Sequence, residues 1–305
     1  MSRSDELSRL HLFSRGVAAT TLLLVVAGGL VTSTGSGLAV PDWPLSYGQW
    51  FPPMVGGVRF EHSHRLIAVT VALLTIVLAV WLWRAARTQT IRWLGLVAVG
   101  MVLAQALLGG ATVLLKLPPI VSIGHACLAQ LFFCSVVTIA VMTSQSWHCA
   151  TPTSAEDATR LRYLAAMTTG FIFVQLVLGA VVRHTEGRGI TPHVVVALLV
   201  TMHVMLLARR ISLRHRAQAW LARPAMVLGA LLVVQLMLGV GALIVVLGSS
   251  ATPPPHSVTV LVRTAHVTVG ALLLATSWII TLSSYRLCAP AAMAPTVSIA
   301  VGVAS

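Results

Sequence analysis

Residues 69–80 read VTVALLTIVLAV, a run with no charged residue, glycine or proline. The run lies inside a longer apolar segment at 62–83. A helix of that length crosses the bilayer's hydrocarbon core, which is about 30 Å thick. A strand of an outer-membrane barrel would instead alternate apolar and polar residues. The stretch therefore predicts a membrane-spanning helix.

The composition extends this prediction to the whole chain. Of its 305 residues, 57% are hydrophobic and 9% are charged, whereas a soluble domain has roughly a quarter charged residues. An ordinary soluble enzyme is therefore excluded. The net charge of +13 comes from short basic clusters between apolar runs, which argues against nucleic acid as a partner. We expect an all-α polytopic membrane protein surrounded by lipid.

Eight apolar segments are long enough to span a membrane: 16–34, 62–83, 93–115, 120–143, 163–182, 192–208, 225–247 and 261–283. With the N-terminus inside, fourteen of the 20 basic residues lie on the cytoplasmic side. The positive-inside rule favours this orientation, with both termini cytoplasmic. No cleaved leader is expected, because Asp5 and Glu6 interrupt the basic start and the first apolar run is long enough to span.

An internal repeat divides the chain. The string Gln-x-x-Leu-Gly occurs at 105–109, 175–179 and 235–239, and each copy precedes a span that opens with a histidine. These residues suit helix packing and hydrogen bonding to a neighbour better than direct chemistry. We predict two four-helix halves that are parallel repeats. The expected parts, in chain order, are a cytoplasmic N-terminus (1–15), the N-terminal half (16–143), a linker (144–162), the C-terminal half (163–283) and a poorly ordered tail (284–305).

Four histidines lie at matching depth, near the outer end of each even-numbered span: His64, His125, His193 and His266. A lone intramembrane histidine is more often a packing residue, but polar residues in lipid are costly and usually functional. Two imidazoles facing each other across a four-helix bundle suit the axial positions of a haem iron. Zinc would need three or four converging ligands. His203 is the alternative to His193.

Charged residues stand beside the histidines. Glu61 shares a helix face with His64; it either pairs with an arginine or takes a proton beside a haem edge. Arg65, Arg183 and Arg263 are the outer-side arginines best placed to bind haem propionates, with lipid snorkelling as the alternative. The four cysteines, Cys127, Cys134, Cys149 and Cys288, form no disulfide framework.

Two strings carry a family resemblance. The loop GSGLAVPDWPL at 35–45 and EHSHR at 61–65 closely resemble the haem A synthase family, and the similarity covers about residues 16–285. It implies an oxidoreductase of the bacterial cytoplasmic membrane that oxidises the C8 methyl of haem O to a formyl, through a hydroxymethyl stage, for cytochrome oxidase. It implies that His64 and His125 flank the substrate haem, with Glu61 beside it, and that His193 and His266 ligate a haem b cofactor.

Partners implied by the resemblance are haem O, haem A, the haem O synthase, oxidase assembly factors and a second copy of the chain. One departure is clear: many members carry paired cysteines in the outer loops, and this chain has Ser46 in that loop and no cysteine near Gly187. Two other functions stay open. The chain could be a non-catalytic di-haem cytochrome, or, less in keeping with its uncharged spans, a transporter.

Overall fold

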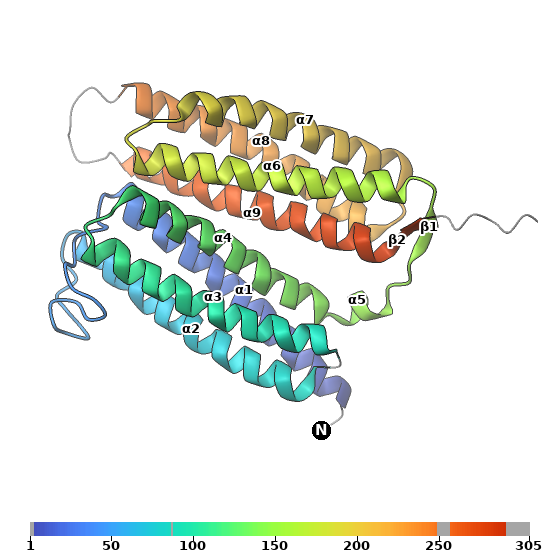
Figure 1. The fold of residues 1–305 in the computed structure, drawn as a ribbon, viewed down its shortest axis with the longest axis horizontal. Coiled ribbons are helices and arrows are strands. Elements are labelled where there is room, and N and C mark those ends of the chain that lie inside the picture. Colours follow the sequence, from blue (N-terminus) through green and yellow to red (C-terminus); the bar gives the residue numbers. More distant parts are fainter. Residues whose placement is uncertain (1–2, 87, 249–256, 291–305) are drawn as a thin grey trace, which may run out of the picture.

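The computed structural model describes residues 3–86, 88–248 and 257–290 (Figure 1). Eight of its helices are long and apolar enough to cross a membrane, so the prediction of an all-α polytopic membrane protein is confirmed. The elements in chain order are α1 (Arg3–Ser33), α2 (Val58–Ala85), α3 (Gln89–Leu114), α4 (Pro119–Met142), α5 (Gln145–Cys149), β1 (Thr153–Ala155), α6 (Ala158–His184), α7 (Ile190–Arg214), α8 (Ala219–Gly248), α9 (Ser257–Leu287) and β2 (Cys288–Pro290).

Local chemistry explains where several elements begin and end. Pro119 is the first residue of α4, where its missing N–H costs no helical hydrogen bond. The hydroxyl of Ser144 accepts a hydrogen bond from the Trp147 N–H and so caps α5. Gly35 after α1 and Gly189 before α7 have φ values of 70° and 88°, a left-handed conformation that a residue without Cβ adopts most easily.

The spanning helices form two bundles of four (Figure 1). In the N-terminal half, α1, α2, α3 and α4 each pack against the next and α4 closes on α1; α6 to α9 repeat this ring in the C-terminal half. The histidines therefore lie on helices that are not neighbours within their ring, α2 and α4 in one half, α7 and α9 in the other. This arrangement lets two side chains face each other across a bundle.

The halves meet along α1, α4, α6 and α9. The indole Nε1 of Trp278 donates to the Thr138 hydroxyl at 2.8 Å, which links α9 to α4. Gly29 of α1 faces Thr264 of α9 so closely that a Cβ on Gly29 would lie 3.3 Å from the threonine methyl. Arg183 of α6 donates to the Thr32 carbonyl at the end of α1. Small residues and polar pairs thus join the two halves, as in membrane helix packing generally.

The end of the bundles opposite the histidines is held by β1 and β2, a parallel pair with Thr153 opposite Cys288. Arg162 donates to the carbonyls of Ser284, Tyr285 and Cys288. The tail expected from 284 onward therefore begins as helix and strand as far as Pro290, and residues 291–305 lie outside the described part. All four cysteines are free, as predicted.

Candidate functional site

Each of the four predicted histidines lies against a glycine of the preceding helix. A Cβ on Gly28, Gly109, Gly179 or Gly239 would lie 3.1–3.2 Å from the Cε1 atom of His64, His125, His193 or His266, respectively. Such a contact is tighter than ordinary van der Waals packing of carbon atoms. The glycines therefore allow each imidazole to lie edge-on against a helix backbone. The same arrangement of a glycine and a histidine ring thus occurs four times, at matching positions.

Glutamine is the third member of three of these groups. The amide nitrogens of Gln105, Gln175 and Gln235 lie 3.4, 3.2 and 3.5 Å from Nε2 of His125, His193 and His266. Gln105 also donates to the His125 carbonyl at 2.9 Å. The expectation that the glutamines bond to a neighbouring helix is confirmed, and the neighbour is the histidine. The corresponding position in α1 is Leu24, so His64 alone has an apolar residue there.

The histidine pairs fit a haem iron. The ring centres of His193 and His266 are 6.5 Å apart. Two metal–nitrogen bonds of about 2 Å and two ring radii of about 1 Å span about 6 Å. His64 and His125 are also close enough to interact electrostatically. The described residues include no group of three or more His, Cys, Asp or Glu side chains that could hold a metal ion.

Buried atoms at these positions lack protein partners. Nδ1 of all four histidines, and Oε1 of Gln105, Gln175 and Gln235, are buried without a hydrogen bond in the part of the chain that the structure describes. Unpaired buried polar atoms are costly and uncommon. Their recurrence at equivalent places indicates sites completed by a bound group, and imidazole pairs are the donor set of a haem.

The loop between α1 and α2 is fastened to the EHSHR string. Glu61 is 3% exposed; one carboxylate oxygen accepts from the Val40 N–H at 2.9 Å and the other pairs with Arg65 at 2.6 Å. Arg65 also donates to the carbonyls of Val40, Asp42 and Leu45 at 3.2, 2.7 and 2.6 Å. Both oxygens of Glu61 and four N–H groups of Arg65 are therefore engaged in holding the loop.

Other contacts complete this fastening. His62 is buried and bonds through Nδ1 to the Ser46 hydroxyl at 2.8 Å. The Asp42 carboxylate accepts the N–H groups of Tyr47 and Gly48. Burial acts to raise the pKa of Asp42, but these N–H groups outweigh it and lower the pKa below its usual value. The two strings that carry the family resemblance thus bind each other.

Trp43 joins the loop to the histidine end of α3. A Cβ on Gly110 would lie 2.8 Å from the indole ring, so the ring lies flush against the backbone of α3. The adjacent residue, Gly109, is the one that accommodates His125. The loop therefore covers the end of the N-terminal bundle next to its histidines.

The remaining predicted arginines lie at the junction of the halves. Arg183 donates to the Thr32 carbonyl, and it is close enough to Arg263 of α9 for their charges to repel. Between the described residues no hydrogen bond or ion pair engages Arg263. Two nearby guanidinium groups favour an anion between them.

The other histidines have separate environments. His203 bonds through Nδ1 to the Leu199 carbonyl at 2.9 Å, and its ring centre lies 4.5 Å from that of Phe171; both contacts indicate packing within the bundle. His215 pairs with Asp157 at 3.0 Å and His11 with the Thr143 hydroxyl at 3.3 Å. His184 ends α6, and His256 lies outside the described residues.

Comparison with known proteins finds similarity over part of the chain. Residues 58–191 match the family model COX15-CtaA, described as cytochrome oxidase assembly protein. Over these residues the chain is similar to the COX15-CtaA family. The matched region contains Glu61, His64, Arg65 and His125 and ends before His193.

Individual proteins that are similar to the chain carry a more specific name. The chain is 31% identical over 181 residues to the heme A synthase of Lysinibacillus sphaericus, covering 58% of the chain and 59% of that protein. It is 26% identical over 178 residues to the heme A synthase of Geobacillus kaustophilus, covering 57% and 56%. The heme A synthase of Shouchella clausii is 31% identical over 170 residues, covering 54% and 56%. The matches thus span less than two thirds of these relatives. With eight apolar helices of spanning length among the described residues, the chain is a multi-pass membrane protein similar to these bacterial proteins.

Proposed function

We propose that the chain is a haem A synthase, which oxidises the C8 methyl of haem O to a formyl through a hydroxymethyl intermediate. The observation that carries the proposal is the pairing of four glycines with four histidines, two pairs in each bundle of a chain similar to the COX15-CtaA family. Oxidising an unactivated methyl is beyond the side chains of a protein. A haem in each half would provide one reactive and one electron-transferring centre.

The substrate haem is assigned to His64 and His125 in the N-terminal half. This half differs from the other in two ways that suit an active site. Leu24 replaces the glutamine found beside the other histidines, and the loop held by Glu61 and Arg65 covers the bundle end. A farnesylated haem is lipophilic, so its delivery by a neighbouring haem O synthase in the membrane and its transfer to oxidase assembly factors are part of the proposal.

The haem b cofactor is assigned to His193 and His266. Their ring spacing of 6.5 Å and the glutamine beside each ring support this pair. His203 is the weaker candidate because its Nδ1 bonds to a backbone carbonyl and its ring packs against Phe171. When bound, haem b would exchange electrons with the substrate site. Gln175 and Gln235 would orient the two imidazoles.

The residues around the substrate would mainly position it and exclude water. Glu61, with both oxygens engaged, keeps Arg65 oriented, and Arg65 keeps the loop closed over the bundle. Proton transfer by Glu61 would require one of these bonds to open. Arg183 and Arg263, which repel each other, are assigned to haem propionates. Arg65 is less suited to bind a propionate, because four of its N–H groups already bond to Glu61 and the loop.

The proposed orientation places both termini in the cytoplasm, because the basic residues cluster at the ends of the helices opposite the histidines. The haem sites would then lie near the outer surface of the cytoplasmic membrane. A homo-oligomer would bury part of the apolar surface, such as Leu107, Leu198 and Met237, all more than 60% exposed in the single chain.

Co-expression with a source of haem O tests the function. The purified protein's haems are extracted and separated by chromatography. The proposal predicts haem A or its hydroxylated precursor together with haem b. Haem b alone would favour the second candidate, a di-haem electron-transfer cytochrome, which the paired histidines would equally support.

A further inference from the structure

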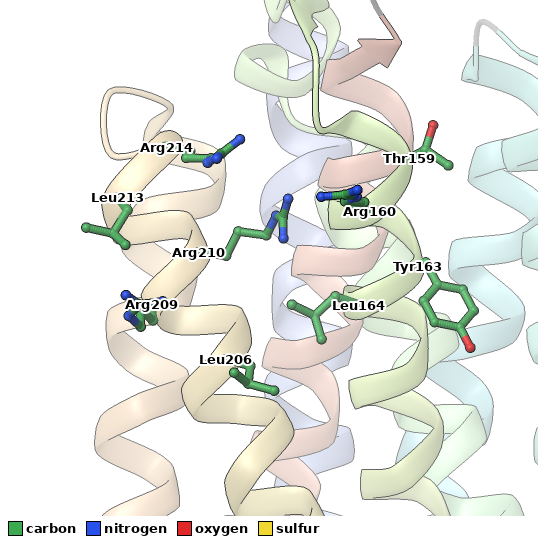
Figure 2. A pocket seen from close by; sticks show the side chains of 9 residues that line it. All are labelled: Thr159, Arg160, Tyr163, Leu164, Leu206, Arg209, Arg210, Leu213 and Arg214. Carbon is green, nitrogen blue, oxygen red and sulfur yellow. The ribbon is translucent and has the colours of Figure 1, made fainter.

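A basic groove lies at the end of the C-terminal bundle opposite the histidines, between α6 and α7. Figure 2 shows its lining: arginines from both helices beside leucines and a tyrosine. The groove encloses about 830 Å³. Its four arginines are Arg160, Arg209, Arg210 and Arg214.

Most of this positive charge is not neutralised by the protein. Arg210 pairs with Asp157 at 2.8 Å, and Arg214 lies 3.9 Å from the same carboxylate. Asp157 also pairs with His215. Within residues 3–86, 88–248 and 257–290, no hydrogen bond or ion pair engages Arg160 or Arg209. Asp157 thus pairs with two of the four guanidinium groups, and the groove keeps an excess of positive charge that attracts an anion.

Apolar side chains line the same groove. Leu206 and Leu213 of α7 are 46% and 66% exposed, and Tyr163 of α6 is 67% exposed. Leu164 of α6 points toward Leu206 of α7 (Figure 2). A ligand that filled the groove would therefore meet guanidinium groups at one part and hydrocarbon at another. Phospholipids combine an anionic phosphodiester with acyl chains, and basic pockets between membrane helices bind such head groups.

The internal repeat supplies a comparison within the same chain. Counted from the equivalent glycine and histidine, Arg209, Arg210 and Arg214 correspond to Val80, Trp81 and Ala85 of α2. Trp81 packs there against Phe13, with ring centres 5.6 Å apart; Phe13 corresponds to Leu164. The fold therefore does not require arginines at these three positions of α7. Arg160 of α6 does have an arginine, Arg9, as its counterpart, so the α7 arginines are what is particular to the groove in the C-terminal half.

We propose that the α6–α7 groove binds an anionic phospholipid, with its phosphodiester at Arg160 and Arg209 and its acyl chains along Leu206 and Leu213. Arg210, which also lines the groove, is held by its ion pair with Asp157. The proposal does not depend on the haem chemistry, because the groove lies at the other end of the helices.

Native mass spectrometry of the detergent-purified protein tests this proposal. Phosphatidylglycerol or phosphatidylcholine is titrated in, and bound lipid is counted. We expect preferential binding of phosphatidylglycerol. The double variant Arg160→Gln/Arg209→Gln should weaken this binding roughly thirtyfold, since each arginine near an anionic lipid contributes a factor of about five. The matched control is Arg9→Gln/Arg84→Gln, which removes the same charge at the same end of α1 and α2 and should change binding less than about twofold.

Two results would overturn the proposal. An equal loss of phosphatidylglycerol binding in Arg160→Gln/Arg209→Gln and in Arg9→Gln/Arg84→Gln would show a general effect of charge and not a binding site. Displacement of phosphatidylglycerol by millimolar inorganic phosphate would show a site for soluble phosphate. The variant Arg160→Lys/Arg209→Lys retains the charge and should retain most of the binding, which separates loss of the site from loss of folding.

Discussion

Replacement of Gly179 by leucine should abolish haem binding in the C-terminal half. A Cβ at this position would lie 3.1 Å from Cε1 of His193, about 0.5 Å inside an ordinary carbon–carbon contact. The leucine Cγ adds a further bond of about 1.5 Å. The imidazole would therefore have to retreat by about 2 Å, which equals a metal–imidazole bond length of about 2 Å. Ligation by His193 cannot survive this shift.

The matched control is Gly170→Leu on the same helix, where a Cβ would meet nothing within 4 Å. Both substitutions replace glycine within a helix and so favour the helix by roughly 1 kcal/mol. Loss of helix stability therefore cannot explain a difference in haem content between the two variants. Haem b per protein is measured by pyridine haemochrome spectra. We expect the control to match the wild type and Gly179→Leu to retain less than about a fifth. Unchanged haem b and an unchanged spectrum in Gly179→Leu would refute the assignment of His193.

Three further predictions concern the loop, Trp43 and the ion pair at the opposite end. Arg65→Met removes four hydrogen bonds to Glu61 and the loop; limited proteolysis should cut residues 35–57 at least about tenfold faster, with haem b retained, and an unchanged rate would contradict the proposed closure. Gly110→Val should displace the Trp43 ring, 2.8 Å from the added Cβ, and lower haem A formation, whereas Gly100→Val, with nothing within 4 Å, should not; equal activities would count against a role for Trp43. Burial acts to raise the pKa of Asp157, but hydrogen bonding to Arg210 and the charge of His215 lower the pKa below its ordinary value of 3.8. The carboxylate therefore stabilises the fold above that value, and this stabilisation is lost as the pH falls below it. Asp157→Asn should cost roughly 2 kcal/mol at neutral pH and flatten the fall of the melting temperature between about pH 5 and about pH 3; parallel melting curves would exclude this linkage.

The spans and the depth of the histidines could be predicted from sequence because both follow from distance along the chain. A bilayer fixes how many apolar residues a helix needs, and the rise per residue fixes how deep His64 or His266 lies. The repeated glycines were also visible in the sequence. Their contact with the imidazoles was not, because it depends on how each helix is rotated about its axis.

The loop shows the limit of sequence reasoning more clearly. The pairing of Glu61 with an arginine was one of the two expected roles of Glu61, and the structure shows it with Arg65. Residues 35–57 have no helical or strand periodicity, so nothing in the sequence indicated that Arg65 would also donate to three loop carbonyls. Arg65 was therefore assigned to a haem propionate. The contact of Arg183 with Thr32 depends on the placement of one bundle against the other, which the sequence of either half does not specify.

Haem analysis of two double variants tests the central claim most directly. His64→Ala/His125→Ala and His193→Ala/His266→Ala are each co-expressed with a haem O source, and their haems are extracted and quantified. The two-site account predicts that the first variant keeps haem b and contains neither haem O nor haem A, and that the second loses haem b. Loss of the same haem from both variants, or full haem content in either, would contradict it.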